Sequence, residues 1–156
     1  MCGIVGTYHS ISLDETQLKI WDQLMEVGNV RGGDGAGAIL VEKNNSVDWA
    51  KVGQAGHHHP TLLRNFAHYK KLRERARNSG RALVGHHRFG TKGETSADNS
   101  HPFQVDHITL VHNGTLTYVP DEKKYDVDSH ALTACIASRG AVKAFQDIFG
   151  AYACVW

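Results

Sequence analysis

Apolar positions along the chain follow two periods, one typical of strands and one typical of helices. Residues 2–8 (CGIVGTY) form a short apolar run that predicts a buried strand. A capping-box pattern from Ser12 to Glu15 then predicts a helix N-terminus, and Gly28 predicts where that helix ends. Between them, apolar residues recur at helical spacing at Leu18, Trp21, Leu24 and Met25.

The same patterns predict further elements up to the last residue. The Asn44-Asn45 pair predicts a turn between two strands, and a polar loop rich in glycine, serine and threonine is expected at residues 90–100. The strands are expected at 36–42, 47–53, 82–89, 107–112 and 151–156, and the helices at about 60–78, 128–138 and 141–149.

Strands that precede, separate and follow helices predict an α+β domain, without the regular alternation that favours a doubly wound sheet. The 156 residues suffice for one domain with a sizeable core, and no repeat or linker is visible. The last predicted strand reaches Trp156 without a turn or a polar tail, which would leave it without a partner on one edge. We therefore expect the chain to be a fragment of a longer protein.

Composition and charge argue against several classes of protein. Lys and Arg (17) nearly balance Asp and Glu (16), so no overall field draws the chain to nucleic acid or to a membrane. The N-terminus lacks the features of a signal peptide, and no apolar stretch approaches the length of a bilayer span. The three cysteines, Cys2, Cys135 and Cys154, lack close spacing, which favours free thiols and a cytoplasmic location. Apolar neighbours predict that Cys135 and Cys154 are core residues.

Two clusters of polar residues have alternative interpretations. Basic residues gather between Lys70 and Arg77, either as the solvated face of a helix near its C-terminal end or as a phosphate-binding patch. The triplet His57-His58-His59 contains metal-ligating side chains, but a metal site needs ligands fixed on one scaffold. This triplet lies in a predicted loop beside Pro60 without a cysteine pair, so no metal site is expected.

Cys2 is the first candidate for chemistry. Cytosolic processing removes an initiator Met that precedes a small residue, and this would leave a thiol and a free α-amine on the same residue. An α-amine has a reference pKa of about 7.7–8.0, so it can accept a proton at neutral pH. A nucleophile activated by its own terminal amine is an established solution to acyl transfer.

Six short segments occur in one order along the chain. They are Cys2-Gly-Ile-Val-Gly6, Arg31-Gly-Gly-Asp-Gly-Ala-Gly37, Gly85-His-His-Arg-Phe-Gly-Thr91, His101-Pro-Phe103, Val111-His-Asn-Gly114 and Asp128-Ser129. Together they resemble the class II glutamine amidotransferases, a branch of the N-terminal nucleophile hydrolases. That family includes glucosamine-6-phosphate synthase, the phosphoribosylpyrophosphate amidotransferase of purine synthesis and asparagine synthetase. The resemblance covers nearly the whole chain.

The resemblance implies a role for each matching residue. Cys2 would attack the side-chain amide of glutamine, giving a thioester and releasing ammonia. The side-chain amide of Asn113 and the backbone N–H of Gly114 would form the oxyanion hole. Arg88 would bind the α-carboxylate of glutamine, and Asp128 its α-ammonium. The positions expected to line the glutamine pocket are Phe89, Thr91 and His101, with Arg31 near the thiol.

Each segment taken alone also has a structural explanation. His112-Asn-Gly114 after a strand is a common hairpin turn, and Asp128 could be a helix N-cap. Arg88 could be an ordinary surface residue at a strand end. The glycines of residues 32–37 lack the Lys-Ser/Thr of a phosphate-binding P-loop, and the resemblance suggests instead a turn that passes close to Cys2.

The chain departs from the family at several positions. Phe89 stands where the aminosugar enzymes usually carry Trp, and Lys92 stands where they usually have His. The segment from Leu116 to Asp128 is short, which puts in doubt a full loop closing over the pocket. The family's glutaminase domain is usually longer than this chain.

The resemblance implies a four-layer αββα sandwich of the N-terminal nucleophile hydrolase type, incomplete at its C-terminus. Residues 1–156 would be a glutaminase domain that lacks its last strands and has no acceptor domain. Its partners would be L-glutamine and an acceptor domain or subunit, with a homo-oligomer left open, and it would need no cofactor and no metal. Two alternatives remain: an N-terminal nucleophile amidase for a different amide, and a non-catalytic homologue with a regulatory or assembly role.

Overall fold

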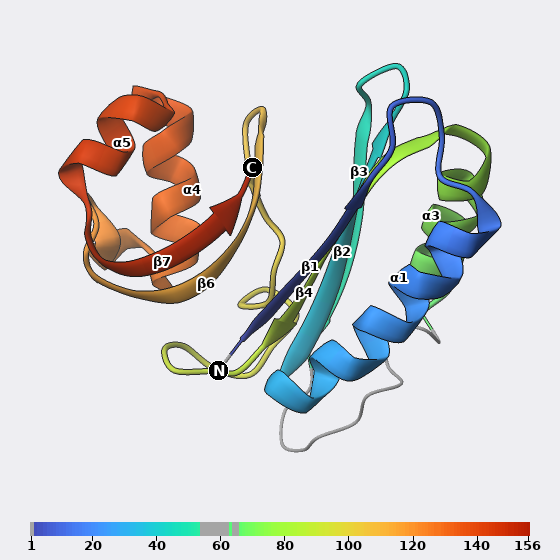
Figure 1. Cartoon of the computed structure of the whole chain (residues 1–156). Coiled ribbons are helices and arrows are strands. Elements are labelled where there is room, and N and C mark those ends of the chain that lie inside the picture. Colours follow the sequence, from blue (N-terminus) through green and yellow to red (C-terminus); the bar gives the residue numbers. More distant parts are fainter. Residues whose placement is uncertain (1, 54–62, 64–65) are drawn as a thin grey trace.

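The N-terminal half of the chain forms a four-stranded antiparallel sheet covered by two helices. The structure is a computed structural model that describes residues 2–53, 63 and 66–156. The strands lie in the order β1-β4-β2-β3, and α1 and α3 cover one face of the sheet (Figure 1). The elements of this half are β1 (Gly3–Tyr8), α1 (Glu15–Gly28), the 3₁₀ helix η1 (Asn29–Arg31), β2 (Gly35–Glu42), β3 (Val47–Gly53), α3 (Ala67–Ser79) and β4 (Gly80–Arg88).

The C-terminal half forms a second sheet with its own helices. Three antiparallel strands lie in the order β5-β6-β7, and α4 packs against β5 and β6. Leu110 and Leu116 of β6 lie in one apolar core with Leu132 and Ile136 of α4. The elements of this half are β5 (Phe103–Val105), β6 (Ile108–Tyr118), the 3₁₀ helix η2 (Glu122–Lys124), α4 (Asp128–Arg139), α5 (Ala141–Asp147) and β7 (Phe149–Val155).

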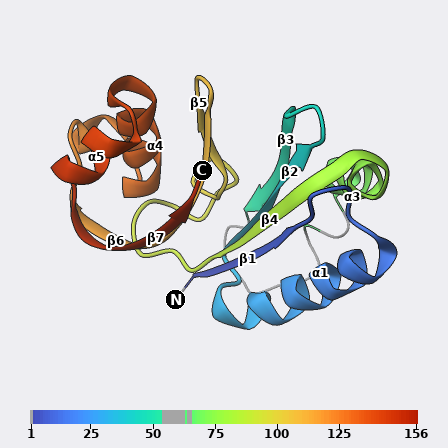
Figure 2. The ribbon, with the colours of Figure 1, turned by 45° about the horizontal axis from the view of Figure 1, so that its top comes forward.

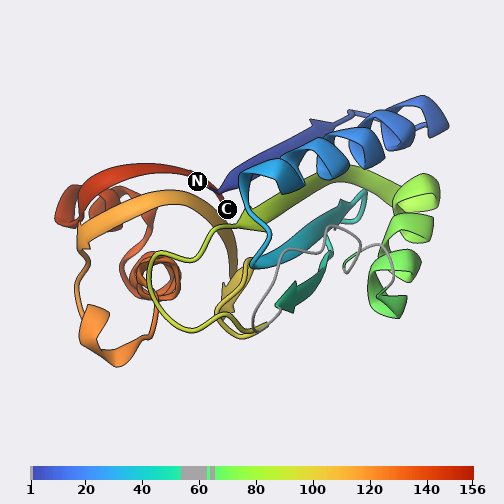
Figure 3. The same cartoon turned by 90° about the horizontal axis from the view of Figure 1, so that it is seen from below.

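The two sheets lie between the two pairs of helices (Figure 2), and β6 contacts both β1 and β4. Seen from below, the pair α1 and α3 and the pair α4 and α5 occupy opposite ends of the molecule (Figure 3). This arrangement confirms the predicted α+β class and the αββα order of layers. Within the described part of the chain, no helix has the length and apolar character needed to cross a membrane.

The first helix begins two residues later than the predicted capping box. Asp14, not Ser12, is the N-cap: its side chain accepts a hydrogen bond from the Gln17 N–H at 2.8 Å, and the Gln17 side chain accepts from the Asp14 N–H at 2.9 Å. This register places Leu13 just before the cap and Leu18 at the fourth helical position, and both are buried in the same core. Packing between these two positions is the hydrophobic staple that often accompanies a capping box.

Strand β6 runs further than predicted and overturns one structural alternative. Residues 108–118 form one strand, so His112, Asn113 and Gly114 lie inside it rather than in a hairpin turn. The reason is the partner strand: β7 pairs with β6 from Val111↔Val155 to Tyr118↔Phe149.

Most other predicted elements are present, with shifted ends. The strands predicted at 36–42 and 47–53 match β2 and β3 closely, and the helix predicted at 60–78 is described from residue 67 to 79. The start of that predicted helix lies largely outside the described residues. The last predicted helix ends earlier, at Asp147, and the last strand begins earlier, at Phe149. Strand β5 was not predicted because it has only three residues.

Candidate active site

A pocket lies where the start of β1, the end of β4, the middle of β6 and the start of α4 meet. It contains most of the residues singled out from the sequence, although they are spread over more than 120 positions of the chain. Its lining residues are Cys2, Arg88, Phe89, Thr91, Lys92, Asn99, His101, His112, Gly114, Val127, Asp128 and Ser129.

Cys2 is held at the pocket by the pairing of β1 with β4. The register Gly3↔His87 places Cys2 beside the C-terminal end of β4. Its Sγ accepts a hydrogen bond from the Phe89 N–H at 3.2 Å. The thiol also donates to the Phe89 carbonyl oxygen, at 3.5 Å. Arg31 lies beside the same residue, and its Nε donates to the Cys2 carbonyl oxygen at 3.2 Å. The half-buried thiol therefore contacts the backbone of Phe89, while the Arg31 side chain holds the Cys2 backbone.

Arg88 is buried, so its interpretation as an ordinary surface residue is wrong. Its guanidinium donates to three successive carbonyl oxygens of the following loop: Lys92 at 2.7 Å, Gly93 at 3.3 Å and Glu94 at 3.2 Å. Burial lowers the pKa of Arg88, while Asp34 and Cys2 oppose this shift. The side chain thus places a positive charge at the pocket and organises the loop that forms one of its walls.

The glycine-rich segment of residues 32–37, whose end lies in β2, passes close to Phe89, whose N–H donates to the Cys2 Sγ. A Cβ at Gly32 would lie 2.5 Å from the carbonyl carbon of Arg88, and one at Gly37 would lie 1.9 Å from the His101 oxygen. These glycines therefore let the backbone pass close to Arg88 and to the loop before β5. In the same segment, Asp34 accepts a hydrogen bond from the Gly90 N–H at 2.7 Å. Asp34 was not singled out from the sequence, although it lies within one of the six segments.

Asp128 begins α4 and joins it to β6. The N-cap of this helix is Val127, and Asp128 is the first helical residue, so the N-cap assignment is wrong by one position. One carboxylate oxygen accepts from the Leu116 N–H at 2.9 Å and the other from the Ser129 N–H at 2.9 Å. A carboxylate in the first turn also suits the helix dipole. Asp128 is only 8% exposed, yet it lines the pocket.

Gly114 and Asn113 are neighbours on β6 but differ in position. Gly114 lines the pocket with a φ of +152° and pairs with Tyr152 of β7. Asn113 is half-buried and does not line this pocket. Because side chains alternate along a strand, Asn113 points to the opposite face of β6 from Leu116, which packs towards α4. β6 also contacts β1, the strand that follows Cys2.

Three buried histidines lie beneath the pocket between the two sheets. The His86 and His101 rings are 3.8 Å apart, and the His101 and His112 rings are 6.4 Å apart. His86 Nε2 lies 2.9 Å from the His112 carbonyl oxygen, to which it donates a hydrogen bond. Burial lowers the pKa of His86 to about 3 and holds the pKa of His101 well below its usual value. The floor of the pocket is therefore neutral at physiological pH.

Lys92 and Asn99, which no sequence argument selected as site residues, also contribute to the pocket. Lys92 Nζ donates to Glu122 at 2.6 Å and to the Leu116 carbonyl oxygen at 3.2 Å. This ion pair connects the loop after β4 to the segment between β6 and α4. Asn99 Nδ2 donates to the Glu94 carbonyl oxygen at 3.2 Å, within the loop that Arg88 also binds. Family spacing did not point to either residue: Lys92 acts through a contact between two segments, and Asn99 through a contact within its own loop.

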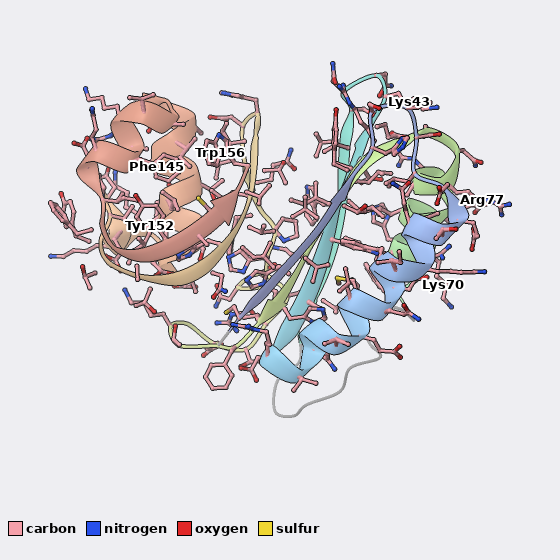
Figure 4. All side chains as sticks on the ribbon, in the orientation of Figure 1. Lys43, Lys70, Arg77, Phe145, Tyr152 and Trp156 are labelled. Carbon is pink, nitrogen blue, oxygen red and sulfur yellow. The ribbon has the colours of Figure 1, made fainter. Side chains whose placement is uncertain are left out.

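The basic residues of α3 serve structural contacts away from this pocket. Arg73 pairs with Asp22 at 2.6 Å, and Arg75 pairs with Glu42 and with Asp48. Lys70 and Arg77 project outward at the far side of the molecule (Figure 4). These contacts favour the solvated helix face over a phosphate-binding patch. Among the described residues no group of three or more His, Cys, Asp or Glu side chains is arranged to hold a metal ion. The triplet His57-His58-His59 lies outside the described residues.

Comparisons with known proteins give one consistent set of relatives. A scan against protein-family models found no match. Amidophosphoribosyltransferase of Pasteurella multocida is 30% identical, over 99% of this chain and 34% of its own length. Glutamine--fructose-6-phosphate aminotransferase (isomerizing) of Staphylococcus aureus is 31% identical, over 74% of this chain and 17% of its own length. The chain thus spans about a third or less of these relatives.

The solved structures agree in fold. The glutamine phosphoribosylpyrophosphate amidotransferase from B. subtilis, complexed with ADP and GMP, superimposes with a TM-score of 0.66 at 20% sequence identity. The match covers 97% of this chain and 34% of that one.

Proposed function

Because the chain belongs to the class II glutamine amidotransferase family, we propose that it hydrolyses the side-chain amide of glutamine through Cys2. The products are glutamate and ammonia, and the ammonia passes to an acceptor held by another domain or subunit. The observation that carries the proposal is one pocket that joins a thiol, a buried cation and a buried carboxylate: Cys2, Arg88 and Asp128.

In this mechanism Met1 is removed and the α-amine of Cys2 accepts the thiol proton. The thiolate sulfur attacks the amide carbon of glutamine, and the carbonyl oxygen becomes an oxyanion. The Gly114 N–H and the Asn113 side-chain amide stabilise that charge. When the tetrahedral intermediate collapses, the C–N bond breaks and the leaving nitrogen takes the proton, so that ammonia departs. Water then cleaves the thioester, giving glutamate and the free thiol.

Substrate selection follows from charge. Arg88 binds the α-carboxylate and Asp128 the α-ammonium, so a free amino acid satisfies two charges that a simple amide leaves unpaired. Phe89, Thr91 and His101 complete the pocket, and Arg31 holds the Cys2 backbone. The neutral histidine floor adds no competing cation beneath Asp128. The free cysteines Cys135 and Cys154 favour a cytoplasmic location.

The test compares substrates that differ only at one end. L-glutamine is compared with glutaramate, which lacks the α-amine, and with L-glutamine α-amide, which lacks the α-carboxylate. Asp128→Asn keeps the shape and removes the charge. Its amide has one acceptor oxygen, so it keeps one of the two backbone hydrogen bonds. It should lower kcat/KM for glutamine by roughly 30- to several-thousand-fold, because an unpaired charge in a desolvated pocket costs about 2–5 kcal/mol. It should change kcat/KM for glutaramate little, and Asp126→Asn, at an exposed carboxylate two positions earlier, is the matched control.

The outcomes separate the alternatives. Equal hydrolysis of all three substrates by the parent protein would favour a broader amidase. No hydrolysis and no covalent labelling of Cys2 would favour the non-catalytic homologue. Intact-mass measurement supplies the remaining check, since a glutamine-hydrolysing sample that retained Met1 would contradict the role of the α-amine.

A further inference from the structure

A buried hydroxyl in the first turn of α4 has no role in the mechanism above. Ser129 is 4% exposed, and its Oγ lies 2.8 Å from His112 Nδ1 and 3.4 Å from the Oδ1 of Asp128. His112 is 2% exposed, and both residues line the pocket. The hydroxyl thus lies between an imidazole on β6 and the carboxylate on α4.

The direction of these hydrogen bonds follows from the chemistry of the three groups. An ionised carboxylate only accepts, and Ser129 has one hydroxyl proton to give. Burial lowers the pKa of His112, so its ring is neutral and carries one proton. If that proton is on Nδ1, the imidazole donates to Ser129 Oγ and the hydroxyl donates to Asp128. In the opposite arrangement the hydroxyl donates to His112 and leaves an N–H on the buried Nε2, which has no protein partner among the described residues. A buried unpaired donor is rarer than a buried unpaired acceptor, which favours the first direction.

Resting on the proposed function, we propose that Ser129 is a positioning residue, which together with His112 orients Asp128 for the α-ammonium of the substrate. The carboxylate of Asp128 already accepts the Leu116 and Ser129 N–H groups, one on each oxygen. The Ser129 hydroxyl adds a longer side-chain contact to Oδ1, at 3.4 Å, which supports the orientation that the two backbone hydrogen bonds set. Because His112 directly precedes Asn113 and Gly114, the same contacts join the ammonium site to the strand proposed to bind the oxyanion.

Thr133 provides a matched control one turn further along α4. Its hydroxyl is fully buried, like that of Ser129, but it donates to the Ser129 carbonyl oxygen at 2.8 Å, a contact to the backbone alone. Thr133→Val therefore removes a buried hydroxyl from the same helix without touching the carboxylate. A purely structural role for hydroxyl groups in this helix would make the two substitutions equivalent.

The experiment measures kcat/KM for L-glutamine and for glutaramate in the parent, Ser129→Ala, Ser129→Thr and Thr133→Val proteins. Ser129→Ala should lower the preference for glutamine by roughly 10- to 100-fold, which corresponds to one hydrogen bond to a charged group. The loss should affect glutamine, while glutaramate is hydrolysed as in the parent. Ser129→Thr keeps the hydroxyl and should recover most of the preference, and Thr133→Val should keep it. Inhibition gives a second measure: Ser129→Ala should weaken inhibition by L-glutamate relative to inhibition by glutarate. Ser129→Thr should recover most of this difference, and Thr133→Val should keep it.

Three results would overturn the proposal. The first is that Ser129→Ala keeps the full preference for glutamine, and the second is that it lowers kcat/KM equally for glutamine and glutaramate. The third is that Thr133→Val lowers the preference as much as Ser129→Ala does. None of these results contradicts the proposal that the parent protein hydrolyses glutamine. A parent protein without any preference for glutamine over glutaramate would instead overturn the α-ammonium site together with this inference. Circular dichroism and thermal unfolding show whether each variant folds. If Ser129→Ala does not fold, the comparison of Ser129→Thr with the parent and with Thr133→Val tests the proposal.

Discussion

The neutral histidines beneath the pocket make the stability of this domain depend on pH. His86 is fully buried, and this burial lowers its pKa to about 3. The hydrogen bond to the His112 carbonyl oxygen opposes the shift, and smaller electrostatic contributions from His87, His112 and Arg88 add to it. In the unfolded chain a histidine titrates near pH 6.5. A group with a lowered pKa in the folded state binds fewer protons there, so stability is greatest above about pH 6.5 and falls as the pH drops towards 3.

The expected loss can be worked out from these two pKa values. Between about pH 7.5 and 4.5 the unfolded imidazole takes up its proton over about two pH units, and the folded one stays neutral. At about 1.4 kcal/mol for each unit, His86 accounts for a loss of about 3 kcal/mol in the free energy of unfolding. The result is insensitive to the exact folded pKa as long as that value lies below about 4.

Urea unfolding of the parent and of His86→Gln at the two pH values tests this magnitude. The side chain introduced by His86→Gln keeps an N–H that can donate to the His112 carbonyl oxygen, but it does not titrate. Between the two pH values the free energy of unfolding of this variant should therefore fall by about 3 kcal/mol less than that of the parent. His101 lies 3.8 Å from this ring and its own titration continues in the variant, so a pH dependence remains. His107→Gln, at an exposed position, should follow the parent curve. Equal losses in parent and His86→Gln would refute the argument.

Three further outcomes are expected. Cys2→Ala should abolish glutaminase activity, and diazo-oxo-norleucine should add to Cys2 rather than to Cys135 or Cys154, whose thiol pKa values burial raises; peptide mapping locates the adduct. Asn113→Ala should lower kcat by roughly 10²–10³-fold with a smaller change in KM, and a loss confined to KM would contradict its role as an oxyanion donor. Lys92→Met should raise KM for glutamine several-fold by removing the ion pair across the pocket, whereas an unchanged KM would mean that this contact does not shape the site.

Local structure was largely predictable from the sequence, because its causes lie within a few residues. Apolar spacing indicated both helix and strand positions, and Gly28 correctly marked the end of α1. The exact helix start was not predictable, since Ser12 and Asp14 both begin plausible caps. Burial of Leu13 and Leu18 in one core selected Asp14, and that burial depends on the sheet beneath the helix.

The extent of β6 depended on a partner strand that no local pattern reveals. The segment His112-Asn-Gly114 has the composition of a turn, and only pairing with β7 shows that it continues an extended strand. Asp128 likewise looked like an N-cap in isolation. Its position as the first residue of α4, bonded to Leu116 of β6, emerges from contacts between elements.

For the site, the sequence by itself determined which residue types occur and in which order, and that order indicated the family. The same resemblance indicated Cys2, Arg88 and Asp128 as candidates, because each occupies a position in one of the six matching segments. Only the tertiary structure decided that Arg88 holds three loop carbonyls, that the histidine floor is neutral, and that Ser129 lies between His112 and Asp128. The physical reason is that burial and hydrogen bonding join residues far apart in the chain, and the energies of charges and donors depend on those surroundings rather than on sequence spacing.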